Sequence, residues 1–282
     1  MPEKIFDAAF AEAPIDVEAF ADLVAIVRQL RRDCPWDREQ THESVKHLLI
    51  EETYEVVEAI DNGDLDGLQV ELGDVLLHVI FHAAIAEGVG RFRFRDVVDA
   101  LTDKLVRRHP HVFGDVVVNG VGDVLSNWES IKTTESGKRK SVLQGVPAEL
   151  PALLRAYRIQ DKVASVGFDF PSASDAWDKV VEEIEEYREA SESTDSEARE
   201  AEFGDLLFAL VNYARLTGIN PEDALRRTNT KFQRRFKQVE DALATEERTP
   251  RDSSLEEMDR LWEAAKLSER DLDSNRAEGA AD

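Results

Sequence analysis

The chain has little of what stabilises secreted proteins or anchors proteins in membranes. It contains one cysteine, Cys34, in 282 residues, which excludes a disulfide framework and favours a reducing compartment. No run of 18 residues is continuously apolar, and the first residues, MPEKIFDAAFAEAP, carry acids where a signal peptide carries basic residues. We therefore predict a cytoplasmic protein without a membrane partner.

Positive charge is also scarce. The chain has 35 lysines and arginines against 59 aspartates and glutamates, and its formal net charge is −24. A surface of this sign repels nucleic-acid phosphates, so we predict no nucleic-acid partner. An anionic substrate would need a metal ion or clustered basic side chains to reverse the field locally.

Strand-like sequence is nearly missing. One short run, VVVNGVG at 116–122, contains an Asn-Gly turn signal and is typical of a small hairpin or of a loop. Elsewhere apolar residues recur at helical spacing, and the pattern predicts an all-α fold. The predicted helices span residues 17–31, 44–61, 65–87, 94–108, 151–165, 174–191, 197–217, 221–243 and 254–268. Residues 33–37, DCPWD, are predicted to form a turn.

Acidic residues are abundant, and some of them repeat with fixed spacing. A first quartet consists of Glu52, Glu55, Glu71 and Asp74. The same quartet recurs 131 residues later as Glu183, Glu186, Glu202 and Asp205. Residues three apart share one face of a helix, so two antiparallel helices would direct four carboxylates to one point. Such a cluster repels itself unless cations neutralise it, which predicts binding of a hard ion, Mg²⁺ or Mn²⁺.

The duplicated quartet predicts two related repeats in one chain. A polar stretch rich in glycine and proline lies between them and is the candidate linker. The predicted organisation is a flexible tail at 1–16, a first repeat at 17–132, a linker at 133–150, a second repeat at 151–268, and a disordered tail at 269–282.

Each repeat also carries a basic triplet after its acids. The triplets are Lys104, Arg107 and Arg108, and, 127 residues later, Lys231, Arg234 and Arg235. Acids followed by a basic triplet would let metal and cations meet around phosphate groups from opposite sides. The first triplet ends in RRHPH, and complementing the dipole at a helix C-terminus explains it equally well.

At this level of detail the chain resembles the MazG family of nucleoside triphosphate pyrophosphohydrolases in its long, two-repeat form. The strings that carry the resemblance are CPWDREQTHESVKHLLIEETYEVVEAI, ELGDVLLHVIF, KLVRRHPHVFGDV, EEIEEYREA, EFGDLLFALVNYAR and KFQRRF. The resemblance implies tandem helical bundles completed by homodimerisation. It implies Mg²⁺-dependent hydrolysis of nucleoside triphosphates between the α and β phosphates, giving a monophosphate and pyrophosphate, in nucleotide-pool sanitation.

The resemblance also implies roles for the matched residues. Both quartets become metal ligands. The acids that precede the quartets, and would orient water or act as base, are Glu51 and Glu182. The residues that would contact nucleotide are Lys179, Asn212, Lys231, Arg234, Arg235, Trp262 and Lys266. Within this set Trp262 would stack on the base, with Lys266 beside it as a charge contact.

The two copies differ at two positions near the acids. Leu48 stands where the second copy has Lys179, and Phe81 stands where it has Asn212. The second copy therefore has an extra cation and an extra amide, and we predict that it is the stronger site.

Two rival interpretations use the same acidic residues. A di-iron carboxylate bundle would need Glu-x-x-His on two helices, and neither quartet contains it. A non-enzymatic helical protein that docks a basic partner through its acidic faces stays open at this point.

Overall fold

The structure is a computed structural model that describes residues 17–124, 127–128, 131 and 141–279. The predicted tail at 1–16 and the first part of the predicted linker lie outside these residues. All regular elements in the described part are helices, which confirms the all-α prediction. Residues 116–118 have no regular structure and residues 121–124 are helical, so no hairpin forms there. The chain divides into two compact units, residues 1–137 and 138–282.

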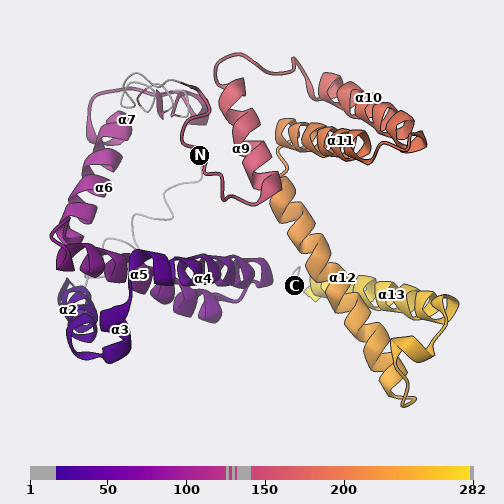
Figure 1. Ribbon diagram of the computed structural model, residues 1–282, viewed down its shortest axis with the longest axis horizontal. Coiled ribbons are helices and arrows are strands. Elements are labelled where there is room, and N and C mark those ends of the chain that lie inside the picture. Colours follow the sequence, from indigo (N-terminus) through magenta and orange to yellow (C-terminus); the bar gives the residue numbers. More distant parts are fainter. Residues whose placement is uncertain (1–16, 125–126, 129–130, 132–140, 280–282) are drawn as a thin grey trace. The chain divides into compact units, whose positions relative to one another are not determined.

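The first unit is built around a helical hairpin. Its elements are α2 (Val17–Asp33), α3 (Pro35–Glu39), α4 (His42–Asn62), α5 (Leu65–Gly88), α6 (Phe94–Arg108) and α7 (Pro110–Phe113). Helices α4 and α5 lie side by side, and α2 packs on α5 (Figure 1). The core under this packing consists of Val27, Val45, Ile80, Phe81 and Ile85.

Local sequence sets the ends of the hairpin helices. Thr41 caps α4 by accepting a hydrogen bond from the Ser44 amide, and the Ser44 side chain returns the contact. Gly63 ends α4 in the left-handed region, with φ of 67°, where glycine has no steric cost. The predicted turn at 33–37 is wrong in part, because Pro35 starts the short helix α3. Proline fits the first turn of a helix, where its missing N–H is not needed.

The second unit repeats this hairpin. Its elements are α9 (Ala152–Ala164), α10 (Ala173–Glu192), α11 (Ser196–Leu216), α12 (Pro221–Ala244), the 3₁₀ helix η1 (Pro250–Asp252) and α13 (Leu255–Gly279). Helices α10 and α11 lie side by side as α4 and α5 do, and α9 packs on α11 (Figure 1).

The last helix, α13, packs on α12 and continues to Gly279, past residue 268, where the predicted helix ends. Glu269 is the reason in side-chain terms. Its buried carboxylate accepts hydrogen bonds from Arg234 and Arg235 of α12, at 2.7 and 2.8 Å. These guanidinium groups hold the pKa of Glu269 below its usual value, against the effect of burial. The chain after residue 268 thus takes part in the packing of α13 on α12.

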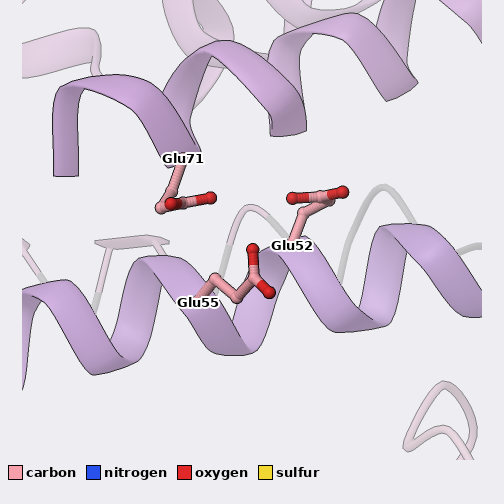
Figure 2. Close-up of side chains that lie close together, drawn as sticks. All are labelled: Glu52, Glu55 and Glu71. Carbon is pink, nitrogen blue, oxygen red and sulfur yellow. The ribbon is translucent and has the colours of Figure 1, made fainter. Parts of the chain in front are cut away.

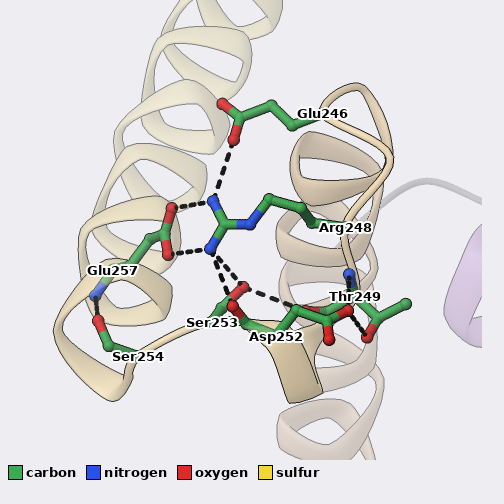
Figure 3. Close-up of polar contacts among 7 residues, drawn as sticks. All are labelled: Glu246, Arg248, Thr249, Asp252, Ser253, Ser254 and Glu257. Atoms are coloured by element: carbon green, nitrogen blue, oxygen red, sulfur yellow. Dashed lines mark hydrogen bonds and ion pairs between the residues drawn. The ribbon is translucent and has the colours of Figure 1, made fainter.

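A single arginine organises the connection between α12 and α13. Arg248 donates to both carboxylate oxygens of Glu257, at 2.7 and 2.6 Å, and to Glu246 at 3.0 Å (Figure 3). It also donates to the Asp252 carbonyl and the Ser253 hydroxyl. A planar guanidinium suits this forked geometry. The connection therefore directs α13 back along α12.

Both hairpins expose large apolar side chains. Examples on α4 and α5 are Ile50, Tyr54, Val70, Leu72 and Val79, and examples on α10 and α11 are Val181, Phe203, Leu207 and Phe208. Helix α5 is long and apolar enough to cross a membrane by length and composition, although only 28% of that stretch is buried. Glu71 and Asp74 lie on the same helix, and charged groups are costly within a bilayer. An apolar surface of this kind fits packing against further helices.

Candidate metal and nucleotide site

The first acidic quartet brings three carboxylates together across the hairpin. Glu52 and Glu55 project from α4 toward Glu71 of α5, and one oxygen from each lies within 4.8 Å of the others (Figure 2). Asp74, the fourth predicted ligand, lies outside this group of three. Its charge still acts on Glu52 and Glu71. Glu51 is exposed beside them.

The electrostatics of this cluster are those of crowded like charges. Burial, followed by the charge of Asp74 and of the other acids, raises the pKa of Glu52. Burial and then a hydrogen bond and the charge from Glu55 raise the pKa of Glu71. In both cases the surroundings disfavour the charged form. A divalent cation would remove this repulsion, and carboxylate oxygens suit a hard ion.

The second quartet forms an equivalent group. Oxygens of Glu183 and Glu186 from α10 and Glu202 from α11 lie within 4.8 Å of one another. Glu183 is only 6% exposed, and its Oε2 has no hydrogen-bond partner in the described part of the chain. Asp205 lies outside the group of three but lines the same cavity as Glu183. A buried carboxylate oxygen without a partner is unusual, and it leaves one ligand position open.

Lys179 distinguishes the second group from the first. Its Nζ donates to Glu183 Oε1 at 2.7 Å and to Glu182 Oε1 at 2.8 Å, and it lies 3.9 Å from Glu186. The hydrogen bonds to Glu182 and Glu183 raise the pKa of Lys179. Burial raises the pKa of Glu186, while the charge of Lys179 opposes that rise. The second group therefore carries its own counter-ion, which Leu48 cannot supply to the first.

A cavity of about 540 Å³ adjoins the second group. It lies among α9, α10, α11 and the turn at 167–170, and Lys179, Glu183, Asp205 and Asn212 all line it. These four predicted site residues are thus brought together. Gln160 also lines the cavity. Sequence reasoning assigned it no role, because it is one polar residue within an otherwise ordinary amphipathic helix.

The predicted basic and aromatic residues of α12 and α13 are elsewhere in the second unit. Trp262 packs on Phe232 at 4.9 Å between ring centroids and lies under Arg235. Lys266 pairs with Glu263 at 2.7 Å, and Lys231 is exposed. Among the described residues that line the cavity, none comes from α12 or α13.

The basic triplet of the first unit lies on α6. Lys104 and Arg107 are exposed, while Arg108 lies over the ring of Trp128, 5.5 Å from its centroid. The group of three carboxylates in this unit comes from α4 and α5 alone. A shared site for triplet and carboxylates in the first unit therefore stays a prediction.

Comparison with known proteins matches this duplicated site. The MazG nucleotide pyrophosphohydrolase domain matches residues 40–113 and again 174–240, the segments that hold the two quartets. The chain belongs to the MazG family. The resemblance drawn from the motifs is confirmed, and it favours an enzyme over a non-enzymatic acidic binding protein.

Relatives of this MazG-family chain align over nearly their whole length. It is 45% identical to the nucleoside triphosphate pyrophosphohydrolase/pyrophosphatase MazG of Thermotoga maritima over 250 residues, 88% of this chain and 95% of that protein. It is 44% identical to the nucleoside triphosphate pyrophosphohydrolase of Escherichia coli K12 over 257 residues, 89% of this chain and 98% of that one. The uncharacterized protein YabN of Bacillus subtilis is 50% identical over 255 residues, 89% of this chain but 52% of that longer protein.

Proposed function

We propose that this MazG-family hydrolase cleaves nucleoside triphosphates between the α and β phosphates, releasing a monophosphate and pyrophosphate, and that it does so with Mg²⁺. Mn²⁺ would substitute, because it prefers the same hard oxygen ligands. The observation that carries this proposal is the duplicated group of three converging carboxylates, one of which adjoins a cavity. Nucleotide-pool sanitation in the cytoplasm, without a nucleic-acid or membrane partner, is the role we propose for the activity.

The residues of the second group fit a divalent cation. They offer only oxygen donors, they crowd negative charge, and Glu183 keeps a buried oxygen without a partner. The residues that would hold the ion are Glu183, Glu186, Glu202 and Asp205. A bound Mg²⁺ would supply charge neutralisation at the phosphate oxygens and a lowered pKa for a bound water. In the first group the corresponding residues are Glu52, Glu55, Glu71 and Asp74.

Lys179 and Glu182 are the residues that could move charge during the reaction. Lys179 is held by Glu182 and Glu183, and an incoming phosphate would offer its ammonium group another anionic partner. When Lys179 turns to phosphate, Glu182 loses its hydrogen bond and becomes free to accept a proton from the attacking water. Glu51 is the matching acid in the first unit.

We also propose that a second copy of the chain completes the site. The exposed apolar faces of both hairpins support this, because a homodimer would bury them. The predicted phosphate-contacting residues of α12 and α13 do not line the cavity of their own unit, which supports a contribution from a partner. The corresponding contacts in the first unit would come from Lys104, Arg107 and Arg108.

The experiment that tests the proposed function is a pyrophosphate-release assay. Normal, deoxy and oxidised nucleoside triphosphates are offered to the purified chain with Mg²⁺, with Mn²⁺, and with EDTA. We expect pyrophosphate from at least one triphosphate with either ion, and loss of release with EDTA that excess Mg²⁺ reverses. Release of inorganic phosphate instead, or turnover that EDTA leaves unchanged, would show that the proposed reaction is wrong.

Replacing Glu71 with glutamine is expected to raise the melting temperature of the metal-free protein at neutral pH. The pKa of Glu71 is raised in the folded state, so the fold is destabilised by keeping this carboxylate charged. This destabilisation is complete above the raised pKa and disappears as the pH falls below the ordinary value of 4.5. The gain from Glu71→Gln should therefore shrink as the pH falls, when thermal unfolding is followed in EDTA.

The matched control is Glu58→Gln, which neutralises an exposed acid on α4 outside the group. Mg²⁺ should stabilise the wild type and the control equally and should stabilise Glu71→Gln less, because that variant loses a ligand. Equal behaviour of Glu71→Gln and Glu58→Gln in EDTA would argue against charge crowding in the first group.

A further inference from the structure

The cavity of the second unit has two chemically different ends. Lys179, Glu183 and Asp205 make one part of its lining charged, and these residues belong to the proposed metal and phosphate site. Most of the rest is apolar, with Phe168, Phe170 and Phe208 among it. Its volume of about 540 Å³ lies within the range of small-molecule sites, roughly 300–1,000 Å³. A ligand with a charged end and a flat apolar end would match it.

Gln160 provides a hydrogen-bond acceptor in this cavity. Its side chain is only 4% exposed, and its Nε2 donates to the Phe208 carbonyl at 2.8 Å. A carbonyl can only accept, so the amide cannot be turned the other way without losing this bond. Oε1 is left buried without a hydrogen-bond partner in the described part of the chain. Buried acceptors are almost always paired, which points to a donor supplied by the occupant of the cavity.

Asn212 provides the opposite polarity. Its Oδ1 accepts from Arg215 Nε at 3.1 Å and from Nη2 at 2.9 Å. Arg215 also pairs with Asp169, and all three residues line the cavity. Because a guanidinium only donates, the Asn212 amide is oriented with its Nδ2 as the remaining donor. The lining thus offers an acceptor and a donor together with aromatic rings.

We propose that this cavity takes the nucleobase of the triphosphate, and that Gln160 Oε1 accepts a hydrogen bond from an N–H group of that base. This inference rests on the proposed function and adds to it the residue that selects the base. A nucleobase is flat and aromatic and has donors and acceptors at its edge, as the lining requires. With the base in the apolar part, the phosphates extend toward Lys179 and Glu183.

The proposal differs from the role that the family resemblance gives to Trp262. Trp262 lies on α13 against Phe232 and Arg235 and does not line the cavity. Under our proposal, base preference depends on Gln160, while Trp262 contributes no discrimination between bases.

The test is Gln160→Met, which keeps the length of the side chain and removes its acceptor. kcat and KM are measured for the four common ribonucleoside triphosphates and for ribose 5-triphosphate, which has no base. We expect kcat/KM for the preferred nucleotide to fall roughly ten- to a hundredfold, mainly through KM, because one hydrogen bond to the base is lost. The ratio between the best and worst bases should shrink, and cleavage of ribose 5-triphosphate should not change.

Two results would overturn the proposal. One is an equal loss on ribose 5-triphosphate, which would make Gln160 a structural residue. The other is base discrimination that survives Gln160→Met but is lost in Trp262→Ala. Failure of the proposed function is a separate result, since the wild type would then release no pyrophosphate from any substrate.

A second variant covers the case in which Gln160→Met does not fold. Phe168 is 79% exposed, so Phe168→Ala removes a ring from the cavity at little risk to the fold. It should raise KM for nucleotides and leave KM for ribose 5-triphosphate unchanged. An unchanged KM for all nucleotides would count against the base in this cavity.

Discussion

Glu183→Gln and Asp205→Ala are each expected to reduce pyrophosphate release at least about a hundredfold, whereas Glu52→Ala leaves most of it. The magnitude follows because even residues that only support metal ligands typically cost ten- to a hundredfold when removed. Glu183 and Asp205 both line the cavity that we assign to the nucleotide. Glutamine keeps the shape of Glu183, so a loss would reflect the missing charge rather than a changed core.

The contrast with Glu52 rests on what surrounds each group of carboxylates. The second group has Lys179 within 2.7 Å of Glu183 and has Asn212 in the adjoining cavity. The first group has Leu48 and the buried Phe81 at the matching positions. Without the cation and the amide, the first site lacks two of the contacts that would orient a triphosphate.

The measurement is pyrophosphate release from the preferred triphosphate at saturating Mg²⁺. Glu189→Ala is the matched control, because Glu189 is an exposed acid on α10 outside the group of three. It should retain full activity. Loss of activity in Glu52→Ala with retention in Glu183→Gln would reverse our ranking of the two sites.

Mixing two inactive variants is expected to restore about a quarter of the wild-type activity. One variant is Glu183→Gln, and the other is Lys231→Glu, which reverses an exposed charge on α12. If α12 of one chain serves the carboxylates of the other, half of the randomly mixed dimers are heterodimers, and each has one intact site of two. Each variant alone has both of its sites damaged.

The two chains are co-expressed with different tags, and the heterodimer is isolated before the assay. A heterodimer with about half of the wild-type activity would support a shared site. If α12 instead serves its own chain, the heterodimer has no undamaged site and stays inactive. A monomeric wild type by sedimentation would dismiss the shared site altogether. Glu189→Ala paired with Lys231→Glu is the control that fixes the activity of a heterodimer with normal carboxylates.

Much of the fold could be predicted because its determinants are local. Helical periodicity and caps such as Thr41 and Gly63 act within a few residues, and the helix limits follow from them. The grouping of Glu52, Glu55 and Glu71 could also be predicted, since i,i+3 spacing on a hairpin leaves few other arrangements. Duplication of the pattern added independent support for both groups.

The remaining features depend on tertiary packing that no local pattern records. Gln160 matters because α9 packs on α11 and turns that side chain toward the Phe208 carbonyl. The pairing of Lys179 with Glu182 and Glu183 could be inferred only as proximity, not as a bond already formed in the chain without nucleotide. The extension of α13 was missed because residues after 268 are mostly polar, and Glu269 is stabilised by arginines 34 and 35 positions earlier.

The pairing of Glu269 with Arg234 and Arg235 makes the end of the chain a competitor of the substrate. Both guanidiniums already hold a carboxylate, so a phosphate that reaches them exchanges one charge-assisted pairing for another. The net affinity is then a difference between two strong interactions and is smaller than either. Such an exchange favours ligands with several negative charges over those with one. The last helix would in this way act as a threshold that monophosphate product fails to pass and triphosphate does.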